Sequence, residues 1–125
     1  SEGTNLPSGE NISNLKKIIN DKALGVILSC VSPENFEKNL IELKNLNVPF
    51  GFKLNGFITT KIKGGYTSVF LGKKSNPNEL LGKRKDLTPN KLAKFVKKFK
   101  DSGATILGGC CETSPSHIEA ISRIK

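Results

Sequence analysis

Apolar residues recur along the chain with two alternating periods, which predict helices and strands in turn. Four segments carry apolar residues three or four positions apart, as one buried face of a helix requires. These segments lie within residues 12–19, 36–46, 92–99 and 118–124. Three apolar runs of strand length separate them, within residues 25–28, 48–54 and 104–107. This alternation predicts an α/β fold in which helices cover a parallel sheet.

Hydroxyl-proline pairs mark the starts of three of these helices. Ser32-Pro33, Thr88-Pro89 and Ser114-Pro115 each place a capping side chain before a proline that fits the first helical turn. Residues 56–86, by contrast, hold several glycines and many lysines without a clear period. We interpret this stretch as a long loop or insertion within one domain that spans residues 1–125.

The three cysteines of the chain follow two of the predicted strands. Cys30 comes after the first strand, and the adjacent pair Cys110 and Cys111 comes after the third, behind two glycines. The carboxyl ends of parallel strands lie at one edge of a sheet, so these thiols can meet although they are far apart in sequence. The odd count and the adjacent pair argue against a disulfide framework and favour reduced thiols in a cytoplasmic protein.

Three converging thiolates indicate a zinc site, because thiolate sulfur is a preferred zinc ligand. Structural zinc usually has four protein ligands, whereas three protein ligands and one open position are typical of catalytic zinc. An open position on a thiolate-rich zinc suits a substrate thiol, and the chemistry indicated is transfer of an alkyl group to sulfur. Buried packing is the alternative role of the cysteines, since most free cysteines are core residues, and spacing alone leaves both readings open.

The net charge of +9 raises nucleic acid as a possible partner. The basic residues are scattered, however, and aromatic residues do not interleave with them as a stacking surface requires. We therefore expect a solvated lysine-rich surface and no nucleic-acid partner. A basic nucleic-acid-binding module with structural cysteines is kept as the alternative function. No apolar run approaches about 18 residues, so the sequence predicts no transmembrane helix and no membrane partner.

The residues around the cysteines resemble a known family. The segment from Gly108 to Ile118, with its two glycines, Cys110-Cys111, Thr113, Pro115 and His117, is similar to the G-G-C-C-x-T-x-P-x-H-I signature of the homocysteine S-methyltransferases. Cys30, before Ser32-Pro33-Glu34, resembles the family's other zinc cysteine, at the end of its sixth barrel strand. The segment from Lys53 to Gly56 resembles the family's seventh-strand K-P-N-x-G segment, with Leu54 in place of proline.

This resemblance implies a zinc-dependent enzyme. Cys30, Cys110 and Cys111 would hold Zn²⁺, and the enzyme would transfer a methyl group to the thiol of homocysteine, giving methionine. The expected donor is a sulfonium compound, S-methylmethionine or S-adenosylmethionine. The activated substrate thiolate would itself be the nucleophile, so the resemblance assigns no catalytic side chain of the protein.

The resemblance also implies an incomplete fold. The family adopts a (β/α)₈ TIM-type barrel of about 250 residues, and residues 1–125 correspond to its C-terminal part, about strands six to eight. We therefore expect a single partial domain that is incomplete on its own. Its expected partner is the missing N-terminal half of the barrel or a second copy of the chain. A fragment without activity is a further alternative.

Two polar residues near these motifs are further candidates for a role at the site. Asn55, at the end of the second predicted strand, is a candidate for substrate binding, with a turn beside Gly56 as the alternative. His117 is the only histidine and lies in the first turn of the last predicted helix. We expect His117 to cap that helix or face the surface rather than to bind metal.

Overall fold

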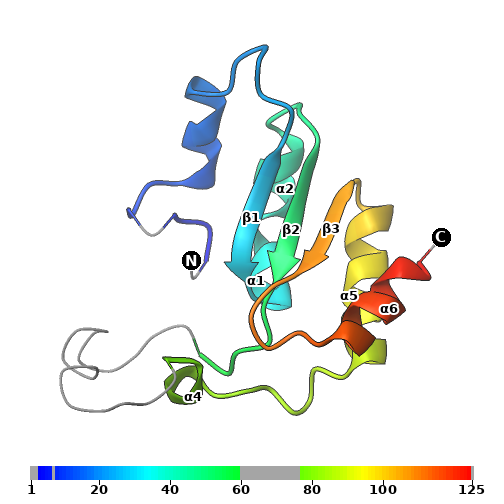
Figure 1. The fold of residues 1–125 in the computed structure, drawn as a ribbon. Coiled ribbons are helices and arrows are strands. Elements are labelled where there is room, and N and C mark those ends of the chain that lie inside the picture. Colours follow the sequence, from blue (N-terminus) through cyan, green and yellow to red (C-terminus); the bar gives the residue numbers. More distant parts are fainter. Residues whose placement is uncertain (1–2, 7, 60–76, 125) are drawn as a thin grey trace.

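A parallel sheet forms the centre of the structure, a computed structural model that describes residues 3–6, 8–59 and 77–124 (Figure 1). Within these residues the sheet has three strands in the order β1-β2-β3. They are β1 (Val26–Val31), β2 (Phe50–Leu54) and β3 (Ile106–Gly109). Both strand pairs are parallel, which confirms the predicted α/β class.

The helices follow the predicted order, except that two helices replace the one predicted within residues 36–46 and that a short helix lies within the predicted loop 56–86. They are the 3-10 helix η1 (Ile12–Lys17), α1 (Pro33–Lys38), α2 (Leu40–Lys44), α4 (Pro77–Leu81), α5 (Pro89–Asp101) and α6 (Pro115–Ser122). The hydroxyls of Ser32 and Thr88 accept hydrogen bonds from backbone N–H groups in the first turns of α1 and α5, as their Ser-Pro and Thr-Pro sequences predict. None of the helices in the described ranges is long and apolar enough to cross a membrane.

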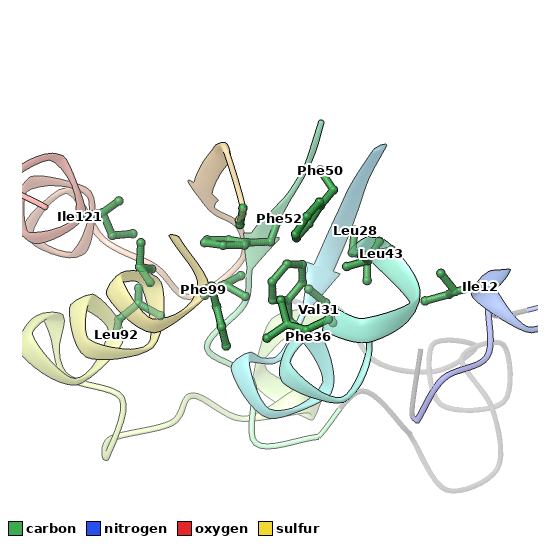
Figure 2. Close-up of a cluster of buried hydrophobic side chains, with 14 of the residues drawn as sticks. Ile12, Leu28, Val31, Phe36, Leu43, Phe50, Phe52, Leu92, Phe99 and Ile121 are labelled. Atoms are coloured by element: carbon green, nitrogen blue, oxygen red, sulfur yellow. The ribbon is translucent and has the colours of Figure 1, made fainter. Parts of the chain in front are cut away.

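The core lies between the sheet and helices α1, α2 and α5, which cover one of its faces (Figure 1). Phe36 of α1, Phe52 of β2 and Phe99 of α5 are fully buried. Their ring centroids are 4.8 to 5.6 Å apart (Figure 2), the separation at which tilted and edge-on aromatic pairs attract. This aromatic cluster fixes β2 against both helices, and thereby sets the position of the strand ends.

The opposite face of the sheet carries exposed residues. Ile27 of β1 is 46% exposed, and the neighbouring Lys53 of β2 is exposed as well. Gly51 of β2 lies against β3 so closely that a Cβ atom there would come within 1.9 Å of the Ile106 carbonyl oxygen. No described helix packs on this face as α1, α2 and α5 do on the other, so the sheet is covered on one side only within the described part of the chain.

The stretch 56–86 differs from an uninterrupted loop, because it contains the short helix α4. Its two ends lie side by side: Phe57 and Lys83 form an antiparallel bridge, and the Arg84 N–H donates to the Gly56 carbonyl at 2.8 Å. Helix α4 has only five residues, which is too short for an apolar period to reveal it. Residues 60–76 of the predicted loop lie outside the described residues.

Candidate metal centre

The three cysteines meet at the carboxyl edge of the sheet, toward which the arrowheads point in Figure 1. The Sγ atom of Cys111 lies 3.9 Å from that of Cys30 and 3.9 Å from that of Cys110. All three Sγ atoms lie within 4.8 Å of one another, and all three side chains are half-buried. The structure thus brings together the residues predicted to share one site.

The spacing of the sulfur atoms suits tetrahedral zinc. Zinc–sulfur bonds of about 2.3 Å place the sulfurs of a tetrahedral site about 3.8 Å apart, and two of the three separations here are 3.9 Å. Among the described residues, no histidine, aspartate or glutamate joins this group. Three thiolates leave a fourth position for another ligand, so the residues present fit a zinc ion with an open coordination position.

A β-bulge in β1 turns Cys30 toward the cysteine pair. Ser29 pairs with Lys53 and Val31 pairs with Leu54, so Cys30 is an extra residue without a partner position in β2. Its φ of 53° lies in the left-handed region, which non-glycine residues seldom adopt. Bulges commonly change the direction of side chains next to functional sites. Here the bulge lets Cys30 face the cysteine pair while the next residue, Val31, faces the core.

Backbone contacts hold the cysteine pair after β3. The Cys110 N–H donates to the Leu54 carbonyl at 2.7 Å, which continues the pairing with β2 beyond the strand. The Cys110 carbonyl accepts from the N–H and the hydroxyl of Thr113, and the Cys111 carbonyl accepts from the Gly56 N–H at 2.9 Å. These bonds tie the turn to β2 and to the start of α6, so the backbone that carries both thiols is held in place.

Gly109 lets this turn pack closely on α6. A Cβ atom at Gly109 would lie 2.5 Å from the Thr113 hydroxyl oxygen and 2.8 Å from Ile118. A Cβ atom at Gly108 would meet only ordinary contacts, at 3.5 Å and beyond. The glycine immediately before the cysteine pair thus lets the side chains of Thr113 and Ile118 pack closely against the turn.

The thiols do not ionise alike in the absence of a cation. Burial raises the pKa of the Cys30 thiol to about 11, and its hydrogen bond with Cys110 adds to this rise. Burial also acts on Cys110, but the Cys111 N–H, the neighbouring thiols and the positive charge of Lys53 outweigh it and lower the pKa of Cys110. Three adjacent thiolates would repel one another, and a bound cation would offset that repulsion.

His117 serves the start of α6, as predicted, and does not join the cysteines. Its Nε2 donates to the buried Leu87 carbonyl at 2.8 Å. Its Nδ1 accepts from the Ser114 N–H at 3.1 Å and contacts the Ser114 hydroxyl at 2.7 Å, which completes a capping box. The expected capping role is confirmed, and the histidine also joins α6 to the segment before α5.

Asn55 is fully buried at the end of β2. Its Nδ2 donates to the Cys30 carbonyl at 2.7 Å and lies 3.7 Å from the Cys30 Sγ, while its Oδ1 accepts from the Phe57 N–H at 3.3 Å. The last bond is the turn contact given as the alternative for this residue. The contact with Cys30 was not predicted, and substrate binding by Asn55 stays a prediction.

An ion-pair network beside the cysteine edge was also not predicted. The half-buried Arg84 donates to Glu34 of α1 at 2.8 Å and to Asp86 at 2.9 Å. Burial alone would raise the pKa of Glu34, but the hydrogen bond and charge of Arg84 lower it. Lys83, next to Arg84, lies 3.6 Å from Glu112, the residue after the cysteine pair. These ion pairs hold the chain after α4 against α1 and against the turn that follows β3.

Together, these features define an α/β protein with three cysteines gathered at the carboxyl edge of a parallel sheet, where they could hold a metal ion. The model of the homocysteine S-methyltransferase family matches residues 1–124, and the chain belongs to this family. It is 29% identical to homocysteine S-methyltransferase 1 of Zea mays, and 31% identical to homocysteine S-methyltransferase 1 of Brassica oleracea var. italica. It is 26% identical to a selenocysteine methyltransferase of Astragalus bisulcatus.

The alignments cover nearly the whole chain but only part of each relative. Each alignment covers 98% of the chain, and 35%, 34% and 33% of the three relatives, respectively. The chain therefore spans about a third of the length of the curated relatives it matches.

Proposed function

We propose that this chain is the zinc-binding part of a homocysteine S-methyltransferase, with Cys30, Cys110 and Cys111 as the zinc ligands. The observation that carries the proposal is the convergence of three Sγ atoms within 4.8 Å, from two strand ends, in a chain of this family. Zinc bound there would supply the charge that favours the thiolate form of a substrate thiol. The protein would work in the cytoplasm, where thiols stay reduced.

The proposed reaction methylates homocysteine and gives methionine. The homocysteine thiol gives up its proton, and its sulfur forms a bond to the methyl carbon of a sulfonium donor. The bond between that carbon and the donor sulfur breaks, and its electron pair stays on the donor sulfur. One thiol and one sulfonium thus become two thioethers and a proton. S-methylmethionine and S-adenosylmethionine both carry such a methyl group, and either fits this balance.

We infer further that the chain is the C-terminal part of a (β/α)₈ barrel and needs a complement. Within the described residues, β1 and β3 are edge strands, and unpaired edges favour association with further strands. The face opposite the helices exposes Ile27 and Lys53, and the relatives are about three times as long as the chain. The complement would be the N-terminal part of the barrel or a second copy of the chain.

A methyl-transfer assay tests this function. The protein at its full encoded length, and residues 1–125 alone, would be loaded with zinc and given homocysteine with each sulfonium donor, with methionine as the readout. We expect methionine from the full-length protein, none after Cys110→Ser, and an unchanged rate after Ser116→Ala in exposed α6. A zinc-loaded full-length protein that makes no methionine from either donor would contradict the function, and full activity of residues 1–125 as a monomer, by size-exclusion chromatography, would contradict the need for a complement.

A further inference from the structure

Asn55 holds both sides of the bulge that presents Cys30. Its backbone N–H donates to the Val31 carbonyl at 2.9 Å, just after the bulge, and its Nδ2 donates to the Cys30 carbonyl at 2.7 Å, within the bulge. The bulge leaves Cys30 without a partner position in β2, so its carbonyl needs another donor, because buried carbonyl groups without one are unfavourable. The side chain of Asn55 supplies that donor.

The same amide nitrogen also faces the sulfur. Nδ2 carries two hydrogens, and the Cys30 Sγ lies 3.7 Å away, within reach of a weak N–H···S hydrogen bond. Such a bond is stronger to a thiolate than to a thiol, and it limits the directions in which the Cys30 side chain can point. The Oδ1 atom is occupied by the Phe57 N–H. Both polar ends of this fully buried side chain therefore contact the protein itself.

From this geometry we infer that Asn55 is a positioning residue for the metal centre: it holds the Cys30 bulge and directs the Cys30 sulfur toward Cys110 and Cys111. The inference rests on the proposed zinc site and gives Asn55 a role other than the substrate contact expected from the sequence. An amide is required, because only an amide of this length offers two N–H groups to Cys30 and an oxygen to Phe57. Aspartate has nearly the same shape but offers no hydrogen to the Cys30 carbonyl or thiolate.

Zinc affinity of the protein at its full encoded length, measured by competition with a chromophoric chelator, tests this role. Asn55→Asp and the uncharged Asn55→Ala should each weaken zinc binding by about 10- to 100-fold, the usual effect of losing a partner of a metal ligand. Both should also shift the sulfur-to-metal charge-transfer absorption of the Co²⁺-loaded chain, because the sulfur changes direction. If Asn55→Asp does not fold, by circular dichroism, Asn55→Ala carries the test.

Asn39→Asp is the matched control. Asn39 is also fully buried, and its Nδ2 donates to two backbone carbonyls, of Gly3 and Asn35, in contact with none of the cysteines. This variant should keep the wild-type affinity and Co²⁺ absorption. Wild-type affinity and absorption in the Asn55 variants, or an equal loss of affinity in Asn39→Asp, would overturn the inference alone. A wild-type chain that binds no zinc would instead overturn the proposed function, and the inference with it.

Discussion

Replacement of His117 by phenylalanine should destabilise the fold, because the imidazole joins two segments through hydrogen bonds that phenylalanine cannot make. The Leu87 carbonyl, in a residue only 3% exposed, would lose its bond to Nε2. A buried group left without its partner costs about 1–3 kcal/mol. The Ser114 N–H, which is partly buried, would lose its acceptor Nδ1, at a smaller cost of about 1 kcal/mol. The expected loss of unfolding free energy is therefore about 2–4 kcal/mol.

Two milder variants separate these contributions. His117→Gln can keep a donor near the Nε2 position, and His117→Asn can keep an acceptor near the Nδ1 position, so each should lose less than His117→Phe. Urea unfolding, followed by circular dichroism, would measure all three. Glu119→Gln, in an exposed pair on the same helix, is the control and should stay within about 0.5 kcal/mol of wild type. A His117→Phe protein as stable as this control would refute the reasoning.

Three further variants test the core, the turn and the ion pairs. Phe36→Ala removes a fully buried ring that contacts Phe52 and Phe99, and urea unfolding should show a loss of about 3–5 kcal/mol. Gly109→Ala places a methyl group against Thr113 and Ile118, so it should weaken zinc binding in chelator competition, whereas Gly108→Ala should not. Arg84→Met should destabilise the protein more at neutral pH than at acidic pH. The lowered pKa of Glu34 means that its ion pair stabilises fully above the ordinary value of 4.5, and this stabilisation is lost as the pH falls through the lowered value. Urea unfolding at about pH 7 and about pH 2 should therefore show a larger difference between wild type and Arg84→Met at the higher pH. Some difference should remain at the lower pH, because Arg84 also lowers the pKa of Asp86 and keeps this second pair to lower pH.

The sheet and the cysteine edge could be predicted because they depend on local patterns. Apolar runs of strand length fall between segments of helical period, and parallel strands bring their carboxyl ends to one edge. The break between α1 and α2 could not be seen in this way. The apolar period continues through it, since Phe36, Leu40 and Leu43 all face the core, although Asn39 lies between the two helices.

The details of the site depend on contacts between distant residues. The bulge at Cys30 is a property of the register between β1 and β2, which no single strand sequence specifies. Asn55 reaches a residue 25 positions earlier, and Arg84 reaches Glu34, 50 positions earlier. The three cysteines could thus be named as candidate ligands from the sequence, whereas the residues that contact them required the structure.

Zinc content of the purified protein at its full encoded length tests the central claim most directly. The chain would be equilibrated with zinc, freed of unbound metal and analysed for zinc and sulfur by mass spectrometry, alongside Cys110→Ser, Cys30→Ser and the control Ser116→Ala. A site of three thiolates predicts about one zinc ion per wild-type and Ser116→Ala chain, and loss of the ion in both cysteine variants. A wild-type chain that binds no zinc, together with strongly salt-dependent binding to DNA or RNA, would contradict the account and favour the nucleic-acid-binding alternative. Zinc retained at full content in both cysteine variants would contradict the assignment of the ligands.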